Sequence, residues 1–269
     1  MSLRDGGLDM EPEGEAFDVE DRLDRAATAL RRERRRTADE LEALGAFAER
    51  VREIEAETAV AEGNAVTAVG LEAGRTDGLD AVREAYEATV MSVPHYAQEY
   101  DDGYPESLRA EFSPDLAAAL TDGTRFNARC KRAVLSATES SRSARGSLLG
   151  TLSTEAESLA AAAETLPSVA REVSEFAARS TAEAPFGTLD AHRARLSVLE
   201  EKCETVADER QSTLFEQRRT TNLPSGTPDV PQYVYQELPF DYPVMAAVAD
   251  LTEAIEAVRD DLRWALARA

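Results

Sequence analysis

Apolar positions along most of this chain recur at steps of three and four residues, which is the spacing of one face of an α-helix. The first stripe runs through Val19, Leu23, Ala27 and Leu30 and resumes between Leu41 and Ile54. This pattern predicts a long helix over about residues 18–61. Asp18 is the expected N-cap, because a side-chain oxygen there accepts from the first free backbone N–H groups.

Four further stripes predict helices over about residues 79–91, 125–166, 189–219 and 243–267. Pro167 should break or kink the helix over residues 125–166, with a helical continuation to about residue 179. The clearest coiled-coil spacing occurs in the last two helices. Their seam positions are Leu196, Leu199, Cys203, Val206 and Arg210, and then Val244, Val248, Leu251, Ile255, Val258, Leu262 and Ala265.

Segments without this spacing separate the predicted helices. Residues 1–16 are rich in Gly and Glu and predict a disordered acidic tail, and glycines from Gly63 to Gly78 mark a break. Residues 91–105 are predicted as a loop and residues 221–243 as a proline-rich linker. Between them, Ser113 followed by Pro114 predicts the start of a short helix.

These elements predict an all-α fold, because no segment shows sustained strand alternation. Each apolar stripe has to be buried against another helix. We therefore expect an elongated antiparallel bundle of long, coiled-coil-like helices, with residues 17–269 forming a single helical domain.

The excess of acidic over basic residues indicates the salt concentration at which such a bundle works. The chain of 269 residues has 52 acidic and 30 basic residues and a net charge of −22, and only Lys131 and Lys202 are lysines. Strong acidity with few lysines is typical of proteins from a very salty cytoplasm, where salt screens the repulsion between like charges. The alternative is an ordinary acidic coiled coil. Either way, general binding to nucleic acid is not expected.

Recognisable membrane-spanning, signal-peptide and metal-binding motifs are absent from the sequence, and this absence bears on where the protein is located and on its chemistry. No stretch approaches 18 apolar residues, and the N-terminus has no signal-peptide core, so we expect a cytoplasmic protein without a membrane span. Two histidines, His95 and His192, and two cysteines, Cys130 and Cys203, supply no recognised metal motif. We predict no catalytic residues, no cofactor and no metal, and both cysteines should be buried on helix seams.

One basic run stands out within the first helix. Residues 31–36, RRERRR, contain Arg31, Arg32, Arg34, Arg35 and Arg36. Such a run is a possible phosphate-contacting patch. The competing interpretation, which the total charge favours, is a stripe that pairs with acidic faces of neighbouring helices.

Two clusters of aromatic residues lie in predicted loops, although aromatic residues make up only 6% of the chain. The first contains His95, Tyr96 and Tyr100, and the second contains Tyr233, Tyr235 and Tyr242. Tyrosine combines apolar area with a polar tip, so the six residues are a possible interaction surface. The alternative is that both loops cap the ends of the bundle. Pro94, His95 and Tyr96 should pack on the helices, with His95 in a structural hydrogen bond.

Three stretches resemble an uncharacterised family of haloarchaeal proteins over roughly residues 79–250. They are AYEATVMSVPHYAQEYDDGYPESLRAEF, LSVLEEKCETVADERQ and YVYQELPFDYPVMAAV, of which TVMSVPHY at 89–96 and LEEKCE around Cys203 are the most specific. The resemblance implies a halophilic, all-helical protein. It carries over no catalytic residue.

Together these features predict a non-enzymatic helical interaction or scaffold protein, which binds itself or another protein through helical seams. The alternative is a ligand-sensing or regulatory bundle with a small-molecule site near His95 and the tyrosine clusters. An enzyme that uses Cys203 or His95 and a nucleic-acid-associated helix are the remaining, weaker hypotheses.

Overall fold

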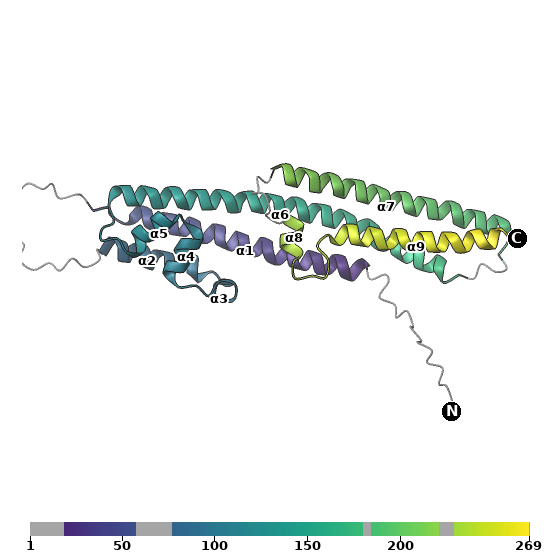
Figure 1. Ribbon diagram of the computed structural model, residues 1–269, viewed down its shortest axis with the longest axis horizontal. Coiled ribbons are helices and arrows are strands. Elements are labelled where there is room, and N and C mark those ends of the chain that lie inside the picture. The colour runs from purple at the N-terminus through teal and green to yellow at the C-terminus, as the bar shows by residue number, and fades with distance from the viewer. Residues whose placement is uncertain (1–18, 58–76, 180–183, 221–228, 269) are drawn as a thin grey trace, which may run out of the picture. The chain divides into compact units, whose positions relative to one another are not determined.

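The computed structural model describes residues 19–57, 77–179, 184–220 and 229–268. The expected N-terminal tail, the Asp18 cap, the glycines from Gly63 to Gly74 and residues 221–228 of the expected linker lie outside the described residues. Within the described ranges every regular element is helical, and an isolated bridge joins Glu57 to Asn127. The all-α prediction is confirmed (Figure 1).

Contacts divide the chain into two compact units. Unit 1 comprises residues 1–31 and 154–269, and unit 2 comprises residues 32–153. Two long helices contribute to both units, namely α1 (Val19–Glu53) and α6 (Ala128–Ala177). Because α6 is continuous through Pro167, the break considered there does not occur.

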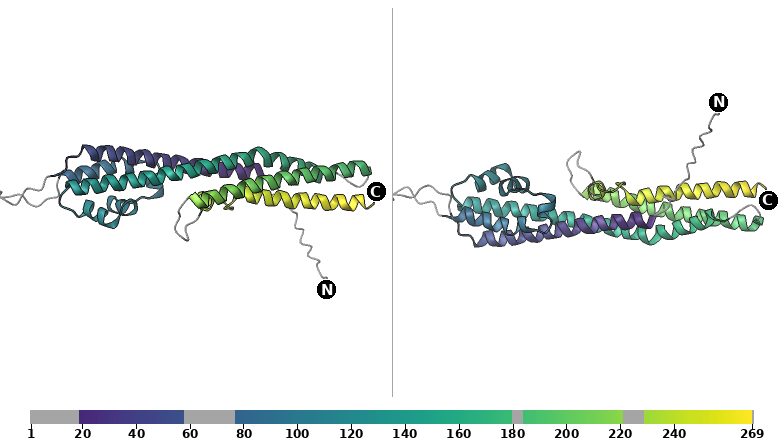
Figure 2. Two further views of the ribbon diagram at one scale, coloured as in Figure 1. Left: turned by 90° about the horizontal axis from the view of Figure 1, so that it is seen from above. Right: turned by 90° about the horizontal axis from the view of Figure 1, so that it is seen from below.

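Unit 1 is built from parts of α1 and α6 together with α7 (Phe186–Thr220), α8 (Val230–Tyr235) and α9 (Pro243–Leu266). In α7, the five predicted seam residues from Leu196 to Arg210 are all buried. In α9, the seam is buried from Val244 to Leu262, while Ala265 is half-buried. Helices α7 and α9 pack side by side (Figures 1 and 2), so the predicted seams are confirmed as packing faces.

Ion pairs fix the register of α6 against α7. Arg195 pairs with Glu172 at 2.6 Å, and Arg210 pairs with Glu155 at 2.8 Å. Residue numbers fall along α7 as they rise along α6, so these two helices are antiparallel. The expectation of antiparallel neighbours is therefore correct for this pair.

A fully buried carboxylate ties three helices of unit 1 together. Glu155 of α6 accepts two hydrogen bonds from the Arg210 guanidinium, at 2.8 and 2.9 Å. It also accepts one from Gln217 Nε2 at 3.0 Å and one from the Tyr235 hydroxyl at 2.8 Å. Glu155 is fully buried, so these four bonds replace the water that its charge has lost.

Part of the segment expected as a linker is helical. Helix α8 begins after Asp229, whose side chain accepts from the Gln232 backbone N–H, while the Gln232 side chain accepts from the Asp229 backbone. This reciprocal pair is a capping box, which satisfies free N–H groups at a helix start. Proline at the second helical position, Pro231, is compatible with it, because the first turn has no partner for that N–H.

Unit 2 packs short helices onto one end of α1 and α6 (Figure 2). They are α2 (Asp77–Glu87), the 3₁₀ turn Val90–Ser92, α3 (Tyr96–Glu99), α4 (Tyr104–Glu111) and α5 (Pro114–Thr121). The region predicted as a loop at 91–105 thus contains helical turns. The short helix predicted after Ser113 is confirmed, because the Ser113 hydroxyl accepts from the Leu116 N–H of α5.

Aromatic rings form the centre of the unit 2 core. Phe47 and Tyr86 meet edge to face with ring centroids 5.2 Å apart, and Phe112 lies 6.1 Å from Tyr86. The Tyr104 ring also meets Tyr86 edge to face, with centroids 5.7 Å apart. These edge-to-face contacts add to the packing of the leucine and valine side chains that make up much of the same core.

Helix α1 ends at Glu53, earlier than the predicted end near residue 61. Lys131 of α6 explains the end, because its ammonium donates to the carbonyl oxygens of Arg52 at 2.7 Å and Ile54 at 2.6 Å. The Glu57 N–H then donates to the Phe126 carbonyl at 2.8 Å. One carbonyl in the last turn of α1 and one just after the helix therefore accept hydrogen bonds from a side chain of α6.

Candidate functional site

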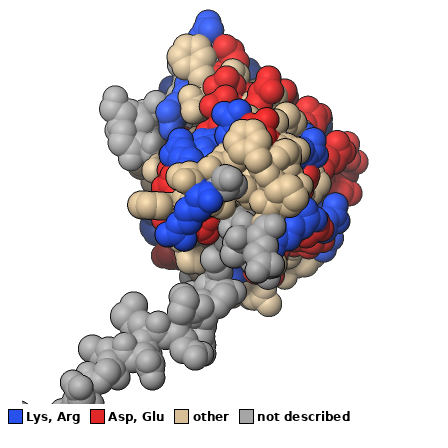
Figure 3. All heavy atoms as spheres, turned by 90° about the vertical axis from the view of Figure 1, so that its right-hand side faces the viewer, with Lys and Arg blue, Asp and Glu red and all other residues tan. Residues whose placement is uncertain are grey.

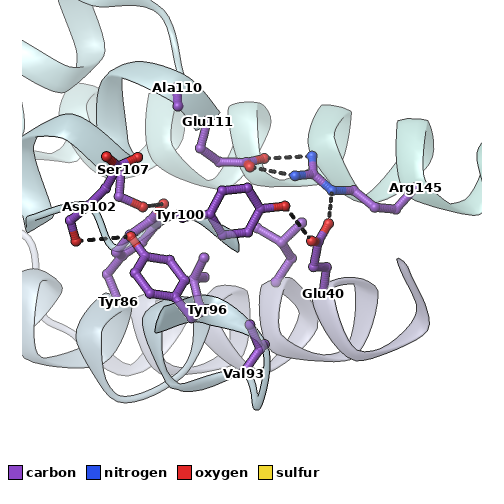
Figure 4. Close-up of a pocket in the computed structure, with 12 residues that line it drawn as sticks. Glu40, Tyr86, Val93, Tyr96, Tyr100, Asp102, Ser107, Ala110, Glu111 and Arg145 are labelled. Carbon is purple, nitrogen blue, oxygen red and sulfur yellow. Dashed lines mark hydrogen bonds and ion pairs between the residues drawn. The ribbon is translucent and has the colours of Figure 1, made fainter. Parts of the chain in front are cut away.

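A polar cluster in unit 2 joins α1, α4 and α6 around one guanidinium. Arg145 of α6 donates from its two terminal nitrogens to the carboxylate of Glu111 on α4, at 2.9 and 2.6 Å. Its Nε donates to Oε2 of Glu40 on α1 at 3.2 Å. One cation therefore bridges two carboxylates that come from different helices (Figure 4).

The surroundings keep Arg145 charged. Burial by itself lowers the pKa of this guanidinium, but the charges of Glu111 and Glu40 and their hydrogen bonds outweigh burial and raise it. The Arg145 guanidinium therefore keeps its positive charge at neutral pH.

The second oxygen of Glu40 anchors the segment around α3. The Tyr100 hydroxyl donates to Glu40 Oε1 at 2.8 Å, and His95 Nε2 lies 3.2 Å from the same oxygen. His95 is buried at the start of α3. Glu40 therefore holds both ends of a short segment that has little helix of its own.

A left-handed residue turns the chain between α3 and α4. Asp101 has φ of 46°, a conformation that Asp and Asn adopt more readily than other residues with a side chain. The turn places Tyr100 and Asp102 on the same cavity. The Tyr96 hydroxyl donates to the Asp102 carbonyl across it, at 3.4 Å.

These elements enclose a partly open cavity of about 190 Å³. Its lining combines apolar side chains, three tyrosines, three acids and one arginine. The lining residues are Glu40, Leu44, Tyr86, Val90, Val93, Tyr96, Tyr100, Asp102, Ser107, Ala110, Glu111 and Arg145. A concave, largely apolar surface with a few fixed polar groups is the usual form of a small-molecule site.

The tyrosines of the cavity are held as neutral phenols. Burial raises the pKa of Tyr86, Tyr96 and Tyr100, and the hydrogen bond to Glu40 raises that of Tyr100 further. The Tyr86 hydroxyl is bonded to Ser107 at 3.0 Å. Each hydroxyl thus has a protein partner, and Tyr100, which is 48% exposed, presents the most accessible ring, whereas Tyr86 is fully buried.

The first predicted aromatic cluster is assembled at this cavity. Tyr96 and Tyr100 line it, and His95 supports it through Glu40. As expected, His95 and Tyr96 are buried and His95 makes a hydrogen bond to a protein side chain. Pro94 was expected to pack as well, but it is exposed, because the chain turns at this residue before α3 begins.

The second predicted aromatic cluster lies in unit 1. Tyr235 is buried and donates to Glu155, and Tyr242 donates to Asp229 Oδ2 at 2.9 Å. Tyr233 keeps 40% of its surface exposed. Two of these three tyrosines therefore have their hydroxyls committed to the packing of unit 1.

The arginine run lies on α1 where the chain passes from unit 1 to unit 2. Arg31 donates to Thr28 at 2.9 Å, and Arg36 forms an ion pair with Glu99 of unit 2. Arg32, Arg34 and Arg35 are exposed. The Arg36 pair agrees with the interpretation of a stripe that meets neighbouring acids.

Sequence reasoning missed the charged centre of the site. Glu40 and Glu111 are two among 52 acidic residues, so their type carries no signal. Arg145 lies in the polar stretch SSRSARGS, where the apolar face of the predicted helix weakens. That weak face was the available sign that α6 buries something other than a hydrophobic seam. In unit 1, Arg210 on an apolar seam was the equivalent sign of the buried Glu155.

Both cysteines were expected to be buried, and this is correct for Cys203 but wrong for Cys130, which is half-buried. Burial raises the pKa of the Cys203 thiol to about 11, and burial also raises that of Cys130. Among the described residues, no group of three or more His, Cys, Asp or Glu is arranged to hold a metal ion. No helix in the described ranges has an apolar stretch long enough to cross a membrane.

A family model described as a domain of unknown function, DUF7260, matches residues 21–259. The chain belongs to the DUF7260 family. The match includes Glu40, Glu111 and Arg145 as well as Glu155 of unit 1, so both polar clusters lie within the DUF7260 domain. No curated protein and no solved structure matches this chain. The function of the DUF7260 domain is therefore argued from its site.

Proposed function

We propose that this protein is a non-enzymatic, ligand-sensing helical protein of a high-salt cytoplasm, whose small-molecule site is the unit 2 cavity. The main observation that supports this proposal is the cavity of about 190 Å³, which has Tyr96, Tyr100 and Arg145 in its wall. The sequence alone favours an interaction or scaffold role over ligand sensing. The cavity favours ligand sensing instead, because it is a formed concave site, whereas the sequence indicates only a cluster of aromatic residues.

Binding without chemistry is favoured by how the polar groups are engaged. All three guanidinium nitrogens of Arg145 bind carboxylates, and both oxygens of Glu40 and Glu111 accept hydrogen bonds. No lone acid or base is left poised over the cavity among these groups. The thiols are poor nucleophiles, because only the thiolate reacts and burial raises their pKa.

The high-salt setting rests on composition. A net charge of −22 with two lysines in 269 residues gives a surface that repels itself in dilute buffer. Molar salt shortens the range of that repulsion to about 3 Å. The same charge disfavours nucleic acid as a partner.

Native mass spectrometry of protein exposed to a desalted small-molecule extract tests the binding function. Ala110→Trp fills the cavity from an exposed position on α4, and Ala119→Trp is the matched control on α5. Wild type and Ala119→Trp should carry the same bound mass, and Ala110→Trp should lose it. An adduct that persists in Ala110→Trp would contradict the cavity as the site.

A second candidate, the helical interaction or scaffold role, is favoured by aromatic side chains on unit 1. Trp264, the one tryptophan of the chain, is 68% exposed near the end of α9, and Phe186 is 63% exposed at the start of α7. Figure 3 looks onto this end of unit 1 and shows uncharged side chains gathered between charged ones. Exposed Trp and Phe are typical anchors of protein interfaces.

Capture of partner proteins in molar KCl tests this second role. Trp264→Glu and Phe186→Glu baits should lose a partner that wild type and an Arg263→Glu control retain. The same binding by all four baits would show that these aromatics are not the interface.

A further inference from the structure

We propose that the unit 2 cavity takes a small organic ammonium ion, a class that includes choline-like quaternary and primary alkylammonium groups. This inference rests on the proposed function and names the ligand class of that same site. Three observations support it, namely the charges of the lining residues, the tyrosine rings in the wall and the size of the cavity.

The charge balance of the wall favours a cation. Glu40 and Glu111 bring two carboxylates to the single guanidinium of Arg145, a formal excess of one negative charge, and Asp102 is a third acidic residue of the lining. Arg145 is also fully engaged, with contacts of 2.6–3.2 Å to two carboxylates. An anionic ligand would have to displace one of these pairs, whereas a cation reduces the excess charge without breaking any contact.

The aromatic wall suits a cation that carries carbon. The rings of Tyr96 and Tyr100 lie with centroids 5.5 Å apart and tilted by 53°, and Tyr100 is 48% exposed. A cation near the face of an aromatic ring is attracted by the negative charge of that face. The hydroxyl protons of Tyr96 and Tyr100 are directed to the Asp102 carbonyl and to Glu40, so these two hydroxyls offer oxygen lone pairs rather than protons to a ligand.

The apolar part of the wall separates an organic ammonium ion from an inorganic one. Leu44, Val90 and Val93 lie beside the acids, and alkyl groups on nitrogen can bury area against them. A hydrated potassium ion gains nothing from such a surface. The cavity volume of about 190 Å³ accommodates a group of choline's size.

Isothermal titration in 2 M KCl, with total chloride held constant, tests the proposal with choline, ethanolamine and 3,3-dimethyl-1-butanol. The alcohol has the shape of choline without its charge. Choline or ethanolamine should bind at least about tenfold more tightly than the neutral alcohol, since cation–π and charge contacts contribute more than about 1.4 kcal/mol.

Variants of the exposed ring separate its π face from its hydrogen bond. Tyr100→Phe keeps the ring and should retain ammonium binding within about threefold, whereas Tyr100→Leu should weaken it about tenfold. Circular dichroism confirms the fold of each variant, which is expected because Tyr100 is 48% exposed.

Three outcomes overturn the ammonium proposal. They are equal affinity for choline, ethanolamine and the neutral alcohol, equal weakening by Tyr100→Phe and Tyr100→Leu, and no binding of either ammonium ion. If a neutral or anionic compound instead binds in a manner that Ala110→Trp abolishes, the ligand class is wrong while the small-molecule function stands.

Discussion

At the scale of single residues, ion pairs that are fully buried in unit 1 and partly buried in unit 2 join the helices within each unit. Glu155 in unit 1 and Arg145 in unit 2 are each bonded to side chains from two other helices. A buried ion pair adds little net stability over an apolar packing, but it penalises any other alignment of the helices. In a core made largely of alanine and leucine seams, such contacts select one register.

Removing the Glu155 carboxylate should destabilise unit 1 strongly. Glu155→Ala leaves the Arg210 guanidinium buried without its anion, which costs about 3–5 kcal/mol. Denaturant unfolding in molar KCl measures the loss, and exposed Glu157→Ala on the same helix should change it by less than about 0.5 kcal/mol.

The double variant Glu155→Met, Arg210→Met is the control for charge. It should recover much of the stability, because an apolar pair of similar volume avoids burying an unpaired charge. Equal stability of Glu155→Ala and wild type would show that the carboxylate is not buried in solution.

The two thiols should react slowly in the folded protein. Their pKa values are raised by burial, that of Cys203 to about 11, so the reactive thiolate is scarce at pH 8. Mass spectrometry after iodoacetamide should show little labelling at pH 8 and full labelling in guanidinium chloride. Rapid labelling of Cys203 at pH 8 under native conditions would contradict its burial.

At the scale of helices, the packing of α9 on α7 stabilises unit 1. Leu251 is fully buried on the α9 seam. Leu251→Ala should therefore cost about 2–5 kcal/mol, because it removes apolar contact and leaves a cavity. The exposed Glu256→Ala on the same helix is the matched control. Equal melting temperatures for the two variants would mean that α9 is detached from its neighbours.

The long helices could be predicted from the sequence because their stripes repeat over many turns. Seam residues such as Leu199 and Ile255 are buried as the spacing indicates. The region 91–111 could not be predicted in the same way. Helix α3 has four residues, too few to be stable alone, and it is held by contacts of His95 and Tyr100 with Glu40, 55 and 60 residues away.

The candidate site could likewise be predicted only in part from the sequence. The aromatic half, Tyr96 and Tyr100, was visible because aromatics are scarce in this chain. The charged half was hidden, because an acid that accepts a buried hydrogen bond looks in sequence like any solvated acid. Only the three-dimensional contacts of Arg145 distinguish Glu40 and Glu111 from the other carboxylates.

At the scale of the whole molecule, excess negative charge opposes folding unless salt screens it. With a net charge of −22, the melting temperature should rise between 0.1 M and 2 M KCl. The screening length falls from about 10 Å at 0.1 M to about 3 Å at 1 M. Circular dichroism melts at both concentrations test this, and equal melting temperatures would contradict the high-salt assignment.

The central claim is that the unit 2 cavity binds a small molecule, and a thermal-shift screen in 2 M KCl tests it most directly. A library of cationic, neutral and anionic metabolites is applied to wild type, Ala110→Trp and Ala119→Trp. At least one compound should raise the melting temperature of wild type and Ala119→Trp and leave that of Ala110→Trp unchanged. Shifts of the same size in all three proteins, or no shift with any compound, would contradict the account.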